Sequence, residues 1–187
     1  MKLSPERAGN CLHPPLTPLP PPFRRRSNTL SVELGEDLLL AAEQLATRGA
    51  AVRAIVLRGA GAHFSPGGNP HAFERGIPYA AVVHAVRQLY MGFMKLHALA
   101  LPLVCAVHGT VIGGGIAACL NCDYIVAEGS ATFEHGNLVR GVCPLGGLSR
   151  TLPHVAGRAR ALAIYLGNGT LSAAEARMAG IVDEVSK

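Results

Sequence analysis

Residues 102–115 have the sequence PLVCAVHGTVIGGG, which joins a short apolar run to a triple glycine. Residues 103–107 are apolar and partly β-branched, a pattern that predicts a buried strand. Gly113–Gly115 then open an expected helix that runs through Leu120, so their amides stand at a helix N-terminus. Because glycine has no Cβ, its N–H group can approach a ligand atom closely. This segment therefore predicts a strand that leads into an amide-lined loop.

A second glycine loop follows an earlier strand. Residues 52–57 form a short β-branched run that ends at Gly59, and residues 64–69, FSPGGN, come soon after it. If the two loops face each other, their amides converge in a way that suits a carbonyl oxygen gaining negative charge. Neither loop has the ending of a phosphate-binding loop, and the triple glycine lacks the dinucleotide-binding spacing. For either loop taken alone, a tight turn where a helix packs on a strand is the favoured interpretation.

The surrounding pattern places these loops in an α/β fold. Further elements are predicted as helices over 34–45 and 82–96, strands over 124–127 and 181–185, and two helical stretches after a loop at 133–147. The last helix begins at Ser172, which forms a capping box with Glu175. Strands that alternate with helices predict a layered fold with a largely parallel sheet.

Length and composition favour one soluble globular domain. The chain has 187 residues, of which 49% are hydrophobic and 16% charged. We find no run of about 18 apolar residues and no apolar signal core near Met1, so neither a membrane span nor secretion is expected. The cytoplasm is the predicted location, and an Arg-rich, acid-poor start leaves an organelle open.

The first 28 residues differ from the rest of the chain. They are rich in proline and arginine, and we predict a flexible leader at 1–28, without strands, before a domain at 29–187. Residues 1–30 carry five basic side chains and one acidic, a net charge of +4 out of +5. The remaining chain is thus close to neutral (5 − 4 = +1), and no nucleic-acid partner is predicted.

The five cysteines do not suggest a disulfide framework, because their number is odd and three lie in apolar stretches. A reducing compartment is therefore expected. Cys119 and Cys122 have the spacing of a redox or zinc motif, but no second pair accompanies them. We interpret them as buried helix-face cysteines, and no metal site is predicted.

Five separated motifs, in this order, resemble those of the crotonase superfamily, the relatives of enoyl-CoA hydratases and isomerases. The motifs lie at 54–65, 102–115, 122–127, 141–147 and 176–185. The resemblance implies an α/β fold of ββα spiral layers, with an acyl-CoA or acyl-carrier-protein thioester as substrate and no other cofactor. It also implies a homotrimer. The usual N-terminal hairpin and C-terminal helices are not recognisable, so the domain is predicted to be incomplete.

The resemblance assigns roles to both glycine loops. It implies that the N–H groups of Gly68 and Gly114 hold the acyl carbonyl oxygen and stabilise an enolate. The residues predicted to bind substrate around these donors are Pro66, Gly67, Asn69, His71 and Gly113.

The chain departs from the family at both catalytic glutamates. Ala117 stands at the first position and Asn137 at the second, and neither can ionise to act as a general base. We therefore expect decarboxylation or dehydration rather than two-glutamate hydration. His135, Glu134 or His71 could supply a base or proton donor, and Asn137 could orient a carboxylate or carbonyl. The predicted catalytic set is thus Gly68, Gly114, His135 and Asn137.

Other interpretations stay open at this point. His135 could simply pack its loop, and His71 could cap the following helix. The loss of both glutamates also permits a catalytically silent thioester-binding or scaffold domain. The loop 133–137, FEHGN, resembles crotonase-like domains of polyketide β-branching, which act on carrier-protein thioesters. A third hypothesis is an anion-binding protein that uses the Pro/Arg-rich leader.

Overall fold

The computed structural model describes residues 2–4, 28–47, 52–68 and 78–186. Residues 5–27, which make up most of the predicted leader, lie outside the described residues, as do Asn69 and His71. The elements in chain order are β1 (Lys2–Ser4), α1 (Val32–Thr47), β2 (Ile55–Arg58), α2 (Tyr79–His97), β3 (Leu103–Val107), β4 (Thr110–Ile112), α3 (Gly114–Cys119), β5 (Tyr124–Glu128), β6 (Thr132–Glu134), a 3₁₀ helix (Leu138–Arg140), α4 (Leu148–Ala156), α5 (Arg158–Gly167), β7 (Thr170–Ser172), α6 (Ala173–Met178) and β8 (Glu184–Ser186).

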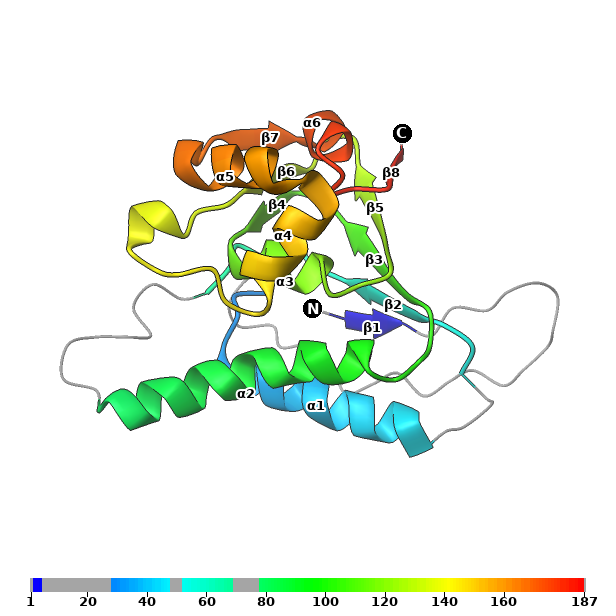
Figure 1. The fold of residues 1–187 in the computed structure, drawn as a ribbon. Coiled ribbons are helices and arrows are strands. Elements are labelled where there is room, and N and C mark those ends of the chain that lie inside the picture. Colours follow the sequence, from blue (N-terminus) through cyan, green and yellow to red (C-terminus); the bar gives the residue numbers. More distant parts are fainter. Residues whose placement is uncertain (1, 5–27, 48–51, 69–77, 187) are drawn as a thin grey trace, which may run out of the picture.

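The main sheet has the strand order β1-β2-β3-β5-β8 (Figure 1). The pairs β2–β3, β3–β5 and β5–β8 are parallel, which confirms the predicted α/β fold with a largely parallel sheet. In this register Leu57 lies opposite Cys105, and Cys105 lies opposite Ile125. All three side chains are buried, so the centre of the sheet forms part of the hydrophobic core.

Several short elements differ from the sequence-based expectation. Strand β1 pairs antiparallel with β2, so the prediction that the leader contains no strands is wrong for Lys2–Ser4. Strands β4, β6 and β7 were not predicted, and three helices rather than two follow the loop at 133–147. Each of these strands has only three residues, too few to show a period of two.

A second, smaller sheet lies beside the upper part of the main sheet, to its left in Figure 1. Its order is β4-β6-β7, with β4 parallel to β6 and β6 antiparallel to β7. The pairing of Ile112 with Glu134 brings the start of the loop 135–147 beside the triple glycine. This small sheet therefore positions the segment that contains His135 and Asn137.

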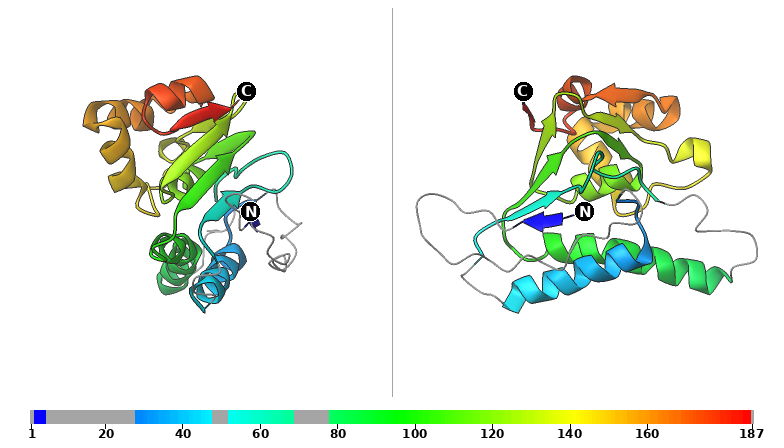
Figure 2. Two further views of the ribbon diagram at one scale, coloured as in Figure 1. Left: turned by 90° about the vertical axis from the view of Figure 1, so that its right-hand side faces the viewer. Right: turned by 180° about the vertical axis from the view of Figure 1, so that it is seen from behind.

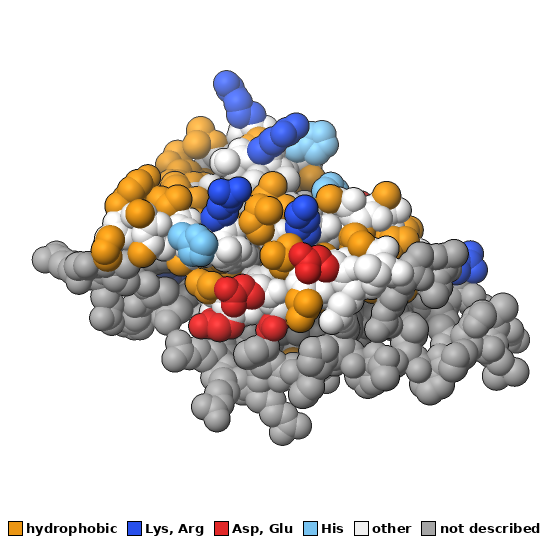
Figure 3. Space-filling view, turned by 90° about the horizontal axis from the view of Figure 1, so that it is seen from below, with side chains coloured by type: hydrophobic (Ala, Val, Ile, Leu, Met, Phe, Trp, Pro, Cys, Tyr) orange, Lys and Arg blue, Asp and Glu red, His pale blue; other side chains and the backbone are white. Residues whose placement is uncertain are grey.

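Helices cover the molecule in two groups. Helices α1 and α2 lie side by side on one side, while α4, α5 and α6 gather around the small sheet on the opposite side (Figures 1 and 2). The first pair can approach closely because Gly35 and Gly92 meet at the crossing: a Cβ on Gly92 would lie 2.6 Å from the Gly35 carbonyl oxygen. On the described part of the face seen in Figure 3, acidic and basic side chains are interspersed with apolar ones.

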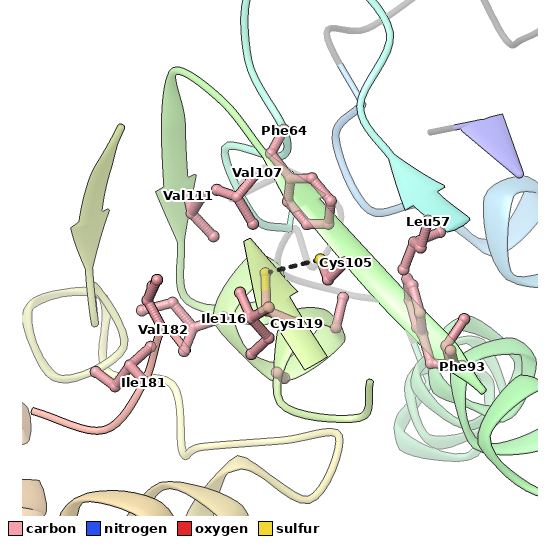
Figure 4. Close-up of a cluster of buried hydrophobic side chains, with 14 of the residues drawn as sticks. Leu57, Phe64, Phe93, Cys105, Val107, Val111, Ile116, Cys119, Ile181 and Val182 are labelled. Carbon is pink, nitrogen blue, oxygen red and sulfur yellow. Dashed lines mark hydrogen bonds between the residues drawn. The ribbon is translucent and has the colours of Figure 1, made fainter. Parts of the chain in front are cut away.

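The core below the main sheet packs the strands against α3 (Figure 4). Cys105 Sγ and Cys119 Sγ are 3.6 Å apart, and burial raises the pKa of the Cys105 thiol well above its ordinary value. Cys119 is fully buried on α3, as predicted, whereas Cys122 lies just beyond this helix with its Sγ against the Ala118 carbonyl oxygen. Both thiols lie near Cys105, and burial and this contact together keep the three side chains part of the core.

Candidate functional site

The first glycine loop runs alongside β4. Ser65 N–H donates to the Thr110 carbonyl oxygen at 3.2 Å, and Ile112 N–H donates to the Ser65 carbonyl oxygen at 3.0 Å. The chain then turns at Gly67, whose φ of +87° is rarely adopted by residues that have a Cβ. Half-buried Pro66 lies inside this turn. The loop from Ser65 to Gly68 is thereby held beside the strand that precedes the triple glycine.

Two buried polar side chains anchor this first loop. Asn28 Nδ2 donates to the Ala60 and His63 carbonyl oxygens at 2.8 and 2.7 Å. Ser65 Oγ donates to the Asn28 carbonyl oxygen at 2.9 Å and accepts from Gly67 N–H at 3.3 Å. Asn28 was expected to be the last residue of the leader, yet only 6% of it is exposed and it belongs structurally to the site.

The second glycine loop forms the start of α3. Gly113 has a φ of +51° and donates its N–H to the Glu134 carbonyl oxygen at 3.0 Å. Its own carbonyl oxygen accepts from Ile116 N–H and Ala117 N–H, at 2.9 and 3.1 Å. Gly114 is therefore the first helical residue, and its N–H has no partner within the helix.

The two loops lie against each other. A Cβ on Gly67 would be 3.8 Å from Gly114 N, and a Cβ on Gly115 would be 2.8 Å from the Ser65 carbonyl oxygen. Leu30 joins them, since its N–H donates to the Gly67 carbonyl oxygen at 2.8 Å and its side chain packs on Gly114. Within the described residues, neither Gly68 N–H nor Gly114 N–H meets a hydrogen-bond acceptor. Two free amides therefore stand on adjoining loops.

The two positions that lack glutamate lie close to the second loop. Ala117 is fully buried in α3. Asn137 is 9% exposed, and its Nδ2 donates to the Cys143 carbonyl oxygen at 3.1 Å. Its Oδ1 is buried and has no partner among the described residues, and it would lie 3.2 Å from a Cβ on Gly113. An unused acceptor thus faces the second glycine loop.

His135 is also brought to this region, with 1% of its surface exposed. Its ring meets the Tyr165 ring edge-on, with centroids 5.0 Å apart, and its Nδ1 has no partner among the described residues. Burial lowers the pKa of His135 below its ordinary value of 6.5, so the imidazole is neutral at pH 7. A buried neutral imidazole can accept a proton more readily than donate one.

Hydrogen bonds from two further side chains fix the loop that carries His135 and Asn137. Arg140 donates to the Gly136 carbonyl oxygen at 2.7 Å, and Gly136 N–H donates to Asn168 Oδ1 at 2.7 Å. The Arg140–Glu134 ion pair at 3.4 Å is largely solvent-exposed and contributes little by itself. The backbone contacts are therefore the main restraint.

A cavity of about 710 Å³ opens between this loop and helices α4 and α5. Its walls are mostly apolar, and its residues are His135, Pro144, Leu148, Ser149, Leu152, Pro153, Arg158, Ala159, Ala161, Leu162 and Tyr165. His135 lines the cavity, and its carbonyl oxygen would lie 3.3 Å from a Cβ on Gly113, so the cavity wall reaches the second glycine loop. Its volume is in the range of small-molecule sites.

The structure adds residues that sequence reasoning missed. Tyr90 Oη would lie 2.9 Å from a Cβ on Gly114, although α2 was predicted only as an apolar packing helix. A signal was present, since Tyr90 follows Val86 by four residues and precedes Phe93 by three, which places it on the apolar face. Leu30, Ser65 and Asn28 gave no comparable pattern. Asn69 and His71, both predicted to bind substrate, lie outside the described residues.

The described residues contain neither a membrane-spanning helix nor a metal-binding cluster. No described helix is both long and apolar enough to cross a bilayer. In the same part of the chain, no group of three His, Cys, Asp or Glu side chains is placed to hold a metal ion.

Comparison with solved structures identifies the architecture as the crotonase fold. The structure of DspI from Pseudomonas aeruginosa superposes with a TM-score of 0.81 at 27% identity, covering 88% of this chain and 62% of that one. The enoyl-CoA hydratase from Bacillus anthracis gives a TM-score of 0.79 at 30% identity, covering 87% and 62%.

Sequence comparison gives the family. The enoyl-CoA hydratase/isomerase family model matches residues 22–187, and the chain belongs to this family, within the crotonase superfamily. It is 35% identical over 139 residues to the probable enoyl-CoA hydratase EchA12 of Mycobacterium tuberculosis, covering 70% of this chain and 48% of that protein. It is 34% identical over 137 residues to a methyl-dioxo-hexahydroindene-carboxyl-CoA hydrolase of the same organism, covering 71% and 53%. The chain spans about half the length of these curated relatives.

Proposed function

We propose that this chain binds an acyl thioester and stabilises its enolate between the amides of Gly68 and Gly114. The observation that carries the proposal is the contact between the two glycine loops, each with an N–H group that has no acceptor in the described residues. Family membership supports a CoA thioester, and a carrier-protein thioester is the alternative. The names of relatives refer to hydratases and a hydrolase that act on CoA compounds.

The two amides suit a developing oxyanion. They are fixed before any ligand arrives, because hydrogen bonds from Ser65 and Leu30 hold one loop and α3 holds the other. Preorganised donors of this kind are effective because they do not have to reorient as charge develops. Removal of one donor costs about 2.7–4 kcal/mol, or a factor of roughly 10²–10³ in rate.

The remaining side chains favour decarboxylation or dehydration over hydration by two glutamates. Ala117 and Asn137 provide no carboxylate that could activate water. In a decarboxylation, the bond between Cα and the carboxylate carbon breaks, carbon dioxide leaves, and the electron pair forms the enolate. A proton then adds to Cα. Neutral His135 suits the role of base in a dehydration: it takes the Cα proton, the enolate forms, and the protonated imidazole returns that proton to the β-hydroxyl as the Cβ–O bond breaks and water leaves.

The cavity between the 133–147 loop and helices α4 and α5 offers space for the acyl group. Its lining is largely apolar, and Arg158 adds one positive charge. Asn137 Oδ1 faces the second glycine loop and has no partner among the described residues, so it can accept a hydrogen bond from an acyl hydroxyl. This arrangement supports a polar substituent near the thioester and an apolar remainder.

A catalytically silent thioester-binding domain is the second candidate. Fully buried Ala117 favours it, because the first glutamate position supplies only a methyl group to the site. Assembly as a homotrimer and the resemblance to polyketide β-branching domains remain predictions.

Mass spectrometry distinguishes these candidates. The purified chain should be incubated with enoyl, 3-hydroxyacyl and carboxylated acyl thioesters, each on CoA and on a carrier protein. Loss of carbon dioxide or of water that depends on the protein supports the enzyme. Binding without any product, by protein whose folding is verified by circular dichroism, supports the silent domain. Absence of both binding and turnover across the panel contradicts the proposed function.

A further inference from the structure

We infer that the hydroxyl of Tyr90 is a third hydrogen-bond donor to the oxygen of the bound thioester, beside Gly114. The inference rests on the proposed function, because it assumes that a thioester oxygen occupies the space between the two glycine loops. It assigns a substrate contact to helix α2, which was predicted only to pack on the core.

The first argument is position. The Tyr90 hydroxyl oxygen lies beside Gly114, at 2.9 Å from where a Cβ on that glycine would stand. The same Cβ would lie only 2.4 Å from Leu30 Cδ1, so Gly114 is closely surrounded on its side-chain face by α2 and by Leu30, two residues before α1. A ligand atom that reaches the Gly114 amide therefore arrives next to a phenol oxygen.

The second argument is orientation. The Tyr90 ring packs directly on Gly146, where a Cβ would lie 2.4 Å from Cδ1 and 2.5 Å from Cε1 of the ring. Gly146 has a φ of +62°, and its carbonyl oxygen accepts from Asn121 Nδ2 at 3.0 Å. The ring is thus held between two glycines, Gly114 and Gly146, and its hydroxyl has little freedom to turn away.

The third argument is chemical state. Burial, and then the neighbouring Cys143 thiol, raises the pKa of Tyr90 to about 12. The phenol is therefore protonated throughout the physiological range and acts as a donor. Tyrosine hydroxyls usually find a partner in the protein or in water. Within the described residues the Tyr90 hydroxyl makes no hydrogen bond, and it is not one of the fully buried atoms without a partner, so it is open to a ligand or to water. A ligand oxygen would satisfy it.

The fourth argument is the space near Ala117. A Cβ on Gly146 would lie 3.3 Å from Ala117 Cβ as well as 2.4 Å from the Tyr90 ring, so ring and methyl group share one wall. Position 117, where the family resemblance implies a glutamate, therefore carries a methyl group close to a neutral phenol donor, which favours stabilisation of an enolate over activation of water.

Acetoacetyl-CoA is a suitable probe, since its enolate absorbs in the near ultraviolet and no turnover is needed. The dissociation constant and the apparent pKa of the bound ligand should be measured for the wild type, for Tyr90→Phe and for Tyr124→Phe. Tyr124 is an exposed tyrosine on β5 and serves as the matched control. We expect Tyr90→Phe to reduce the enolate-to-keto ratio about ten- to a hundredfold, and the control to match the wild type.

The outcomes distinguish failure of the Tyr90 inference from failure of the proposed function. If Tyr90→Phe forms the enolate as well as the wild type does, the role of Tyr90 is wrong while the proposed function stands. If the wild type does not bind the probe, or binds it without enolate, both are wrong. The melting temperature of Tyr90→Phe should stay within about 2 °C of the wild type, because the ring packing is retained. A much lower value would mean that the hydroxyl has a partner inside the protein, which also contradicts the inference.

Discussion

The two glycine loops reach the same site by different means. The first is an irregular segment held by buried side-chain hydrogen bonds, from Asn28 outside the loop and from Ser65 within it. The second is held by regular structure, because Gly113 bonds to the end of β6 and Gly114 begins α3. Space around them also differs: a Cβ on Gly68 would meet no atom within 4 Å, whereas one on Gly114 would overlap Leu30 and approach Tyr90.

The different surroundings of Gly68 and Gly114 indicate that glycine is needed at the two positions for different reasons. At Gly114 the lack of a side chain is required by packing, so a replacement disturbs neighbours as well as the amide. At Gly68 a methyl group fits in the described surroundings, and the N–H is the group that matters for the proposed function. Substitutions that add a Cβ and substitutions that remove the N–H should therefore have different consequences in the two loops.

The largest effect is expected from Gly114→Pro. Proline is accepted at the first position of a helix, but it removes the N–H, and turnover or enolate formation should fall about 10²–10³-fold. Gly114→Ala is the matched control, because it introduces the same Cβ overlap with Leu30 and keeps the amide. The comparison should be made by steady-state kinetics or the acetoacetyl-CoA titration. Equal losses in both variants would show that packing, and not the amide, is what the site needs.

In the first loop, the effect of removing the N–H group should be easier to distinguish from the effect of adding a Cβ. Gly68→Pro is expected to reduce activity about 10²-fold, toward the lower end of the range because this loop is less regular and can shift. Gly68→Ala should stay within about twofold of the wild type, since its Cβ meets nothing within 4 Å. The same kinetic assay checks both. A Gly68→Ala variant as inactive as Gly68→Pro would argue against the amide role.

The anchoring of the first loop predicts a loss of stability. Ser65→Ala removes a fully buried hydroxyl that donates to the Asn28 carbonyl and accepts from Gly67 N–H. Leaving these groups without partners should lower the free energy of unfolding by about 1–3 kcal/mol, measured by urea denaturation. Ser149→Ala, on α4 in the cavity wall, provides a serine control without a described hydrogen bond. Unchanged stability in Ser65→Ala would mean that the second loop alone holds the site together.

The smallest effect is a pH dependence at His135, next to the second loop. Because burial lowers its folded-state pKa below the ordinary value of 6.5, the unfolded chain binds this proton at a higher pH than the folded chain. Stability should therefore decrease as the pH falls below about 6.5, until the folded-state pKa is reached. The melting temperature should be measured at pH 7.5 and at pH 5. Its decrease between these two values should be smaller in His135→Leu than in the wild type. An unchanged pH slope would show that His135 is not buried in solution as described here.

Sequence patterns were most reliable where they span many residues. The helices α1 and α2 and the strands β2, β3 and β5 show clear apolar periodicity, and the capping box of Ser172 and Glu175 is present as predicted. Both glycine loops were predicted from sequence, whereas their approach was only a condition there; the parallel pairing of β2 with β3 brings the two loops to the same edge of the sheet. The short strands and the helix count after 133–147 were missed, since such short segments are determined by their neighbours.

The sequence by itself determined the family, the parallel α/β sheet, the two glycine loops and the absence of both expected glutamates. Each of these features is a pattern of residues along the sequence, and it can be recognised without knowing which residues are in contact in space. Only the tertiary structure decided that Asn28 and Ser65 hold the first loop, that His135 is buried against Tyr165, and that Tyr90 stands beside Gly114. Such contacts join residues more than 20 positions apart, and their geometry depends on how helices and strands pack rather than on any pattern in the sequence.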